Sequence, residues 1–106
     1  MYLPEIYQKF TERFPEIFKD YKQLGKTARE TGPLDSRVQD LVKLGIAIGA
    51  NSQGAVMSST RKALASGATT DEIYQIVMLA LTTTGFPNMI AGLQWVDSVI
   101  KENLED

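Results

Sequence analysis

Apolar side chains recur along most of this chain at the three- and four-residue spacing of an α-helix. The spacing is clearest at Ile73, Ile76, Val77, Ala80 and Leu81, which together fit one buried helix face. No stretch of useful length alternates apolar and polar residues as a β-strand does. The pattern therefore predicts an all-α fold with six helices, over residues 4–13, 15–30, 35–50, 52–66, 69–81 and 87–103.

Two of the predicted helices begin at residues that typically cap a helix. Thr69 is followed three residues later by Glu72, which is the spacing of a capping box. Asp35 and Ser36 can each cap the third helix, and Ser36 with Gln39 also has the capping-box spacing. These residues predict where the third and fifth helices start.

The second half of the third predicted helix has no polar face. Lys43 is its last charged residue, and residues 44–50 are all apolar or glycine. A helix that is apolar on every side has to be covered on every side. Because the chain is short, we expect a second copy to supply part of this cover, so that the protein forms a homo-oligomer. Gly45 and Gly49 have the spacing that lets a neighbouring helix approach closely.

Length and charge narrow the classes of function. With 106 residues, 43% of them hydrophobic and 23% charged, the chain has the composition of a single globular domain over residues 1–106. Eleven basic and thirteen acidic residues give a net charge of −2, which leaves no basic excess for nucleic acid. The N-terminal segment lacks the apolar core of a signal peptide, and no apolar run is long enough to span a membrane. We therefore expect a cytoplasmic protein that binds neither nucleic acid nor membrane.

The sequence contains no cysteine and no histidine. The lack of cysteine excludes disulfides, thiolate catalysis, iron–sulfur clusters and cysteine-ligated zinc. The lack of histidine removes the usual general base near neutral pH and the commonest transition-metal ligand. Any catalysis has to use carboxylates, lysine, tyrosine, hydroxyl groups or a borrowed cofactor. Since no glycine-rich phosphate loop is present either, we expect no cofactor and no metal.

The fourth predicted helix carries a candidate pocket made of small residues. Ser52, Ala55 and Ser59 are spaced so that they share one helix face, and Ser58 lies beside them. Small side chains leave room that a ligand can fill, but they also allow two helices to pack closely, and Ser52 is a good N-cap. A serine nucleophile would need an activating base, here a carboxylate or a lysine. The spacing leaves both interpretations open.

The segment from Leu34 to Pro87 resembles the core of the AhpD-like and carboxymuconolactone decarboxylase family. The resemblance rests on Leu-Asp at 34–35, Arg-Lys-Ala-Leu at 61–64, the phrase GATTDEI at 67–73 and a Gly-Phe-Pro turn at 85–87. It implies a six-helix AhpD-like orthogonal bundle that assembles as trimers or hexamers. It also implies an active pocket beside the third and fourth helices, near the contacts between subunits.

The same resemblance assigns expected roles to individual positions. In redox members of the family the fourth helix opens with the motif C-x-x-C-x-x-x-H, and the flanking residues align Ser52, Ala55 and Ser59 with its two cysteines and its histidine. Asp40 aligns with a glutamate that hands protons to the cysteine pair. A serine hydroxyl cannot form a sulfenate or a disulfide, so peroxidase and disulfide-reductase chemistry is excluded. The histidine that the decarboxylase branch uses in this region is absent as well.

Asp40 is the one ionisable residue among these positions, and it has two interpretations. It can serve in the pocket, or it can be a structural acid, since the helix dipole favours an acid near a helix N-terminus. Arg37 and Lys43, three residues before and after it, are candidate ion-pair partners. We interpret Tyr74 as a packing residue, because an aromatic side chain at helical spacing usually belongs to the core.

Two functional hypotheses follow from the resemblance. In the first, the protein is a non-redox oligomer with a degenerate active site that binds a small ligand or acts as an accessory domain. In the second, it is a lyase or isomerase on a small acidic metabolite such as a lactone carboxylate. Such an enzyme would use Asp40 with the hydroxyls of Ser52, Ser58 and Ser59. The missing histidine favours the first hypothesis.

Overall fold

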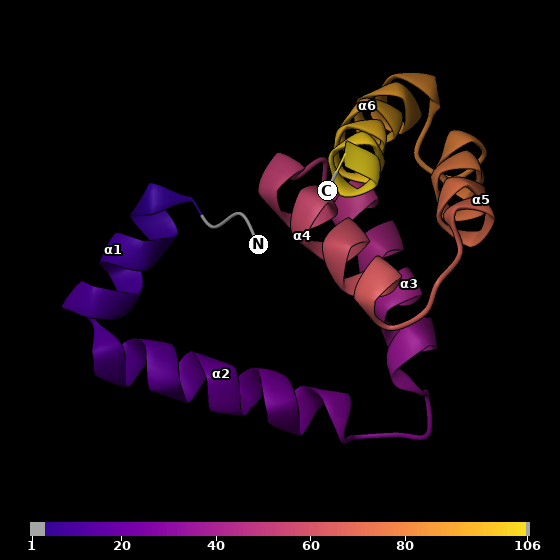
Figure 1. Ribbon diagram of the computed structural model, residues 1–106. Helices are drawn as coiled ribbons and strands as arrows, with labels where there is room; N and C mark the ends of the chain where they lie inside the picture. Colours follow the sequence, from indigo (N-terminus) through magenta and orange to yellow (C-terminus); the bar gives the residue numbers. More distant parts are fainter. Residues whose placement is uncertain (1–3, 106) are drawn as a thin grey trace. The chain divides into compact units, whose positions relative to one another are not determined.

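The computed structural model describes residues 4–105, which fold entirely as helices and turns. Each helix begins and ends within two residues of its predicted bounds, so the all-α prediction is confirmed. The six helices of this range are α1 (Glu5–Arg13), α2 (Pro15–Arg29), α3 (Ser36–Gly49), α4 (Gln53–Ala65), α5 (Thr70–Leu81) and α6 (Phe86–Glu105). The chain divides into two compact units, Met1–Pro33 with α1 and α2, and Leu34–Asp106 with α3 to α6 (Figure 1). That both units make one domain stays a prediction.

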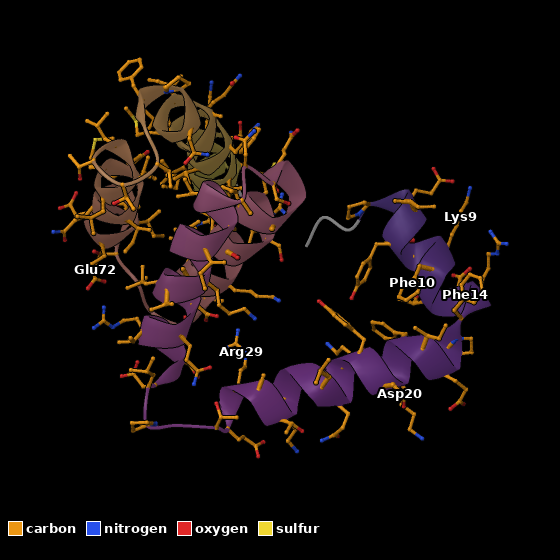
Figure 2. The ribbon with its side chains drawn as sticks, turned by 180° about the vertical axis from the view of Figure 1, so that it is seen from behind. Lys9, Phe10, Phe14, Asp20, Arg29 and Glu72 are labelled. Atoms are coloured by element: carbon orange, nitrogen blue, oxygen red, sulfur yellow. The ribbon has the colours of Figure 1, made fainter. Side chains whose placement is uncertain are left out.

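The first unit is a pair of amphipathic helices joined at Phe14. Pro15 occupies the first turn of α2, where its missing N–H leaves no hydrogen bond unmade. Phe18 of α2 packs edge-on against Tyr7 and Phe10 of α1, with ring centroids 6.0 and 6.3 Å apart. Figure 2 labels Phe10 on α1. No residue of α1 or α2 is buried. Aromatic contacts therefore join the two helices without forming a closed core.

The second unit holds the hydrophobic core. Within it α3 packs against α4 and α5, and α6 packs against the same two helices, so that the four enclose a common interior (Figure 1). Every one of these helices contributes side chains that are at least nine-tenths buried. They include Leu44, Ala47 and Ile48 from α3, Val56 and Ala63 from α4, Ile73 and Val77 from α5, and Met89, Val96 and Ile100 from α6.

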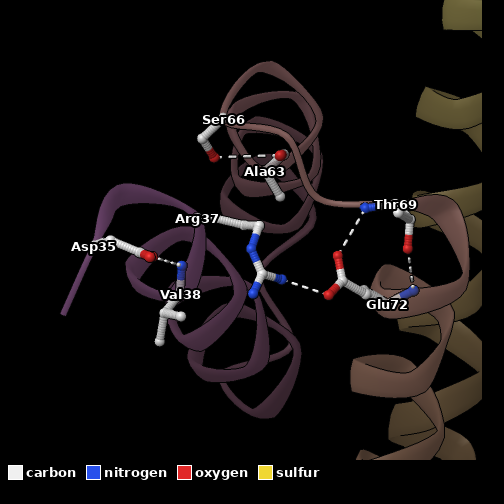
Figure 3. Close-up of polar contacts among 7 residues, drawn as sticks. All are labelled: Asp35, Arg37, Val38, Ala63, Ser66, Thr69 and Glu72. Atoms are coloured by element: carbon white, nitrogen blue, oxygen red, sulfur yellow. Dashed lines mark hydrogen bonds and ion pairs between the residues drawn. The ribbon is translucent and has the colours of Figure 1, made fainter.

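The cap of α5 is the predicted one, whereas that of α3 differs in detail. Thr69 and Glu72 form a complete capping box at the start of α5. At the start of α3 the N-cap is Asp35, whose carboxylate accepts the Val38 N–H at 2.9 Å (Figure 3). The predicted alternative, a box between Ser36 and Gln39, is wrong because the N-cap is Asp35 and Ser36 is already the first residue of the helix.

Two glycines lie where α3 contacts other helices of its unit, and one of them is required there. A Cβ added at Gly45 would meet Ile76 of α5 at 3.6 Å, which is ordinary contact, so the neighbouring helix expected at Gly45 belongs to the same chain. A Cβ at Gly92 of α6 would lie only 2.9 Å from Cγ2 of Ile48. Only a glycine lets α6 approach α3 this closely without displacing Ile48.

One side of α3 stays uncovered by the other helices of the second unit. Ile46 is 66% exposed and Val42 is 47% exposed, although residues 44–50 include no polar side chain. On the opposite side of the same helix, Ile48 is fully buried. Among the helices described between residues 4 and 105, none combines the length and apolarity that a bilayer crossing requires.

Candidate functional site

The candidate site lies at the corner where α3 turns into α4. Asn51, in the left-handed region at φ 55°, reverses the chain, a conformation that Asn adopts more readily than most residues. Its N–H donates to the Ile48 carbonyl at 2.9 Å, and the Ser52 N–H donates to the Ala47 carbonyl at 3.3 Å. These two bonds form a Schellman motif, which satisfies carbonyls at the end of α3. The corner thus sets where α4 begins.

Ser52 is the N-cap of α4. Its Oγ accepts the Ala55 N–H at 3.4 Å, which satisfies one of the free amides of the first helical turn. Ala55 and Ser58 are exposed, while Ser52 and Ser59 are half-buried. The structure therefore brings the four predicted pocket residues together on the accessible side of α4.

The adjoining side of α4 is buried against the core. Val56, Thr60 and Ala63 are buried there. Thr60 is the polar residue among them, and its hydroxyl donates to the Val56 carbonyl of its own helix at 2.7 Å. The buried hydroxyl is therefore satisfied without a ligand, so its polarity does not mark a second site.

Asp40 lies at the opposite end of α4. It is only 5% exposed, and its Oδ2 accepts a hydrogen bond of 2.7 Å from the hydroxyl of Ser66, the C-cap of α4. At a rise of roughly 1.5 Å per residue, Ser66 is about 21 Å from Ser52 along the helix axis. Within one chain, therefore, Asp40 and the Ser52 end of α4 are not brought together.

Arg37 makes an ion pair with Glu72 of α5, not the predicted pair with Asp40 (Figure 3). The reason is tertiary, because the capping box at the start of α5 holds Glu72 beside α3, with its Oε1 accepting the Thr69 N–H at 2.9 Å. The Thr69 N–H, together with the Arg37 guanidinium, lowers the pKa of Glu72 against the opposing effect of desolvation. This network joins α3 to α5 and lies away from the serines of α4.

Tyr74 combines the predicted packing role with a polar contact that the pattern did not indicate. Its ring packs against the core, and its hydroxyl donates to Oδ1 of Asp97 on α6 at 2.5 Å. This hydrogen bond to a carboxylate raises the pKa of Tyr74 to about 12. The bond ties α5 to α6.

A second unpredicted group of polar residues lies at the corner itself. Asn88 of α6 donates through Nδ2 to the Ile48 carbonyl at 2.6 Å and approaches Oδ1 of Asn51 at 3.4 Å. The Thr84 hydroxyl donates to the other end of the same amide, Oδ1 of Asn88. The only signal in the sequence is Asn51, whose residue type tolerates a left-handed turn. Nothing along the sequence links Asn51 to Asn88.

The chemistry available at the corner is that of hydroxyl and amide groups. Ser52, Ser58, Ser59, Thr84 and Asn88 can donate or accept hydrogen bonds, and none of them ionises near neutral pH. Among the residues that the structure describes, no three carboxylates gather in a way that could hold a metal ion. The arrangement is suited to binding a polar molecule.

The comparisons with known proteins agree with this fold. The family model described as the carboxymuconolactone decarboxylase family matches residues 15–98. The crystal structure of an apo carboxymuconolactone decarboxylase family protein from Legionella pneumophila superposes with a TM-score of 0.79 at 19% identity, covering 90% of this chain and 85% of that one. No curated protein matches the sequence. Because the family model spans most of the chain and the fold is shared, the chain belongs to the carboxymuconolactone decarboxylase family.

Proposed function

We propose that this protein is a non-redox member of the family, an oligomer that binds a small polar ligand beside the N-terminal half of α4. The observation that carries the proposal is chemical. The positions that align with the redox motif hold Ser52, Ala55 and Ser59, and the sequence has neither cysteine nor histidine. None of these side chains can cycle between a thiol and a disulfide. The chain has the fold of the family without the groups that the redox reaction needs.

The state of Ser52 supports binding rather than covalent catalysis. Its hydroxyl already accepts the Ala55 N–H, and a nucleophilic serine would need a base beside it. Asp40, the candidate base, is bonded to Ser66 at the far end of α4. The side chains of Ala55 and Ser59 are small, and Ala55 is exposed while Ser59 is half-buried. The hydroxyls there can hydrogen-bond to a polar ligand.

The alternative function is a lyase or isomerase acting on a small acidic metabolite such as a lactone carboxylate. It would use Asp40 as the acid–base group, and the observation in its favour is that this carboxylate is only 5% exposed. Its separation from Ser52 weighs against the alternative, since the two groups would have to act on one substrate. We therefore favour binding without turnover.

A thermal-shift screen tests the proposed function. The wild-type protein is melted with a library of small hydroxy acids, keto acids and lactones, and a ligand at 100 times its dissociation constant stabilises by about 2.7 kcal/mol. We expect Ser59→Leu to abolish the rise in melting temperature by filling the site. Ser98→Leu, which places the same side chain on an exposed position of α6, should keep it. An unchanged rise in Ser59→Leu, or no stabilising compound in the library, would contradict the proposal.

Assembly and location are part of the same proposal. We infer that the protein is an oligomer, because Ile46 and Val42 form an exposed apolar stripe on α3. The resemblance to the family implies that this oligomer is a trimer or a hexamer. A cytoplasmic location, with no nucleic-acid or membrane partner, remains a prediction from composition.

The alternative function has its own assay. Release of carbon dioxide or of an isomerised product from a lactone carboxylate, followed by NMR, would favour the lyase or isomerase over the binding protein.

A further inference from the structure

We propose that Asn88 is a positioning residue that clamps the corner between α3 and α4 and thereby fixes the first turn of α4. Asn88 lies on α6, far along the chain from this corner. Its side chain nevertheless donates to the Ile48 carbonyl at 2.6 Å and approaches Oδ1 of Asn51 at 3.4 Å. One amide therefore contacts both the last turn of α3 and the residue that reverses the chain.

The orientation of the Asn88 amide follows from its partners. A backbone carbonyl can only accept a hydrogen bond, so the NH₂ group of Asn88 has to face Ile48. Its Oδ1 then faces the Thr84 hydroxyl, which can donate to it. The Ile48 carbonyl fixes this orientation, because the Thr84 hydroxyl can either donate or accept. The amide is held at both ends and is a rigid link between α6 and the corner.

The clamp acts at a point where the backbone needs support. Asn51 has φ 55°, a conformation that is costly for most residues other than glycine, although least so for Asn. The Ile48 carbonyl that accepts from Asn88 also accepts the Asn51 N–H at 2.9 Å. The Asn88 amide therefore restrains the Ile48 carbonyl, which is the group that closes the turn by accepting the Asn51 N–H.

The corner transmits this constraint to α4 through Ser52. The Ser52 N–H belongs to the Schellman motif, donating to Ala47, while the Ser52 Oγ caps the helix by accepting the Ala55 N–H. A displacement of Ser52 would therefore disturb both hydrogen bonds at once. Loss of the Asn88 donor should therefore loosen the first turn of α4, and any effect on ligand binding there rests on the proposed function.

Because of its position on α6, the contact that Asn88 makes with the corner can be removed without destabilising α6 itself. Asn88 is the third residue of α6, where the helix dipole favours a carboxylate. Asn88→Asp should therefore not destabilise α6. It also keeps the size of the side chain and an oxygen that accepts a hydrogen bond from Thr84. It removes the NH₂ group that the Ile48 carbonyl needs. The substitution breaks the clamp without weakening the helix that carries it.

Amide hydrogen exchange of the full chain, followed residue by residue by NMR, tests the clamp without any ligand. The loss of the 2.6 Å hydrogen bond to the Ile48 carbonyl, together with the longer one of 3.4 Å to Asn51, should speed exchange roughly fivefold or more at the amides of Asn51, Ser52 and Ala55 in Asn88→Asp. The amides of Gly67 and Ala68 close the other end of α4 through a second Schellman motif, donating to Leu64 and Ala63, and serve as an internal reference. Their exchange should stay unchanged.

Ser98→Ala is the matched control, because it removes a 3.0 Å hydrogen bond from a side chain of α6 to the Gln94 carbonyl of the same helix. It should change exchange at neither end of α4. Equal acceleration at both ends of α4 in Asn88→Asp, or no acceleration at the corner, would overturn the proposal. If circular dichroism shows that Asn88→Asp does not fold, Asn88→Ala removes the same donor without adding charge and is judged by the same criteria. A failure of the ligand screen leaves this result untouched, so the two proposals fail separately.

Discussion

Separate replacement of Ile46 and Ile48 by aspartate distinguishes a contact between copies from the core of one copy. The two residues lie on opposite sides of α3, with Ile48 at 0% exposure and Ile46 at 66%. An aspartate at position 48 places an unpaired charge in the core, which costs several kcal/mol. We expect Ile48→Asp to unfold the protein, and Ile46→Asp to leave each copy folded.

The size of the effect at Ile46 follows from the area that a second copy would cover. Full burial of an isoleucine side chain is worth about 1.5–3 kcal/mol, and Ile46 is 66% exposed beside the other helices of its unit. Covering this exposed part contributes about 1–2 kcal/mol for each contact. Aspartate loses this contribution and adds the cost of desolvating a charge, so the dissociation constant should rise by about tenfold or more.

Light scattering on a size-exclusion column at micromolar concentration measures the mass of each variant, and circular dichroism measures its helicity. The wild type should be an oligomer, and Ile46→Asp a smaller species of unchanged helicity. Gln75→Asp, which adds the same charge at an exposed polar position of α5, should behave as the wild type. A monomeric wild type, or an Ile46→Asp protein of unchanged mass, would refute the reasoning.

Other predictions concern chemistry, packing and pH. Since the sequence has neither cysteine nor histidine, metal-free protein should consume no peroxide with a dihydrolipoamide-type donor, and measurable turnover would contradict the non-redox proposal. A Cβ at Gly92 lies 2.9 Å from Ile48, whereas one at Gly54 meets nothing within 4 Å. In chemical denaturation the free energy of unfolding of Gly92→Ala should therefore be about 1–3 kcal/mol lower than that of Gly54→Ala. Equal values would show that Ile48 can move aside to make room. The bond to Asp97 raises the pKa of Tyr74 to about 12. The stability from this bond should be complete below about pH 10, where an unfolded tyrosine ionises, and disappear towards pH 12. An absorbance titration in which every tyrosine ionises near pH 10, or in which Tyr74→Phe keeps the last transition, would disprove this assignment.

The helices could be predicted from the sequence because their signals are local. The apolar spacing of α5 and the pair Thr69 and Glu72 lie within a few turns of one another, and the structure has the same helix and the same capping box. The choice between Asp35 and Ser36 as the N-cap of α3 was harder to predict. Both residue types accept an amide hydrogen bond well, so the pattern left the choice open.

The polar contacts between helices could not be predicted in the same way. Arg37 was expected to pair along its own helix with Asp40, but the packing of α5 brings Glu72 within its reach. Asp40 in turn meets Ser66, which lies far from it in the sequence. Spacing along one helix does not indicate which residues of another helix lie opposite.

The candidate site could be predicted only in part, because spacing shows which residues share one helix but not which residues of other helices lie beside them. Ser52, Ala55, Ser58 and Ser59 share the accessible side of α4, as their spacing within one helix indicates. The contribution of Asn88 depends on the approach of α6 to the end of α3, so a single sequence carries no sign of it. Local periodicity therefore indicated which residues share a face of α4, but not that Asn88 contacts the corner.

The central claim is that a small polar ligand binds beside the N-terminal half of α4 without being turned over. The most direct measurement is to titrate the small acids and lactones of the thermal-shift library into isotopically labelled protein and to follow every amide signal by NMR. Our account predicts that the largest shifts fall in residues 52–59 and that the signals of the added compound show no product. Conversion of the compound, largest shifts in another part of the chain, or no shifts with any compound would contradict the claim.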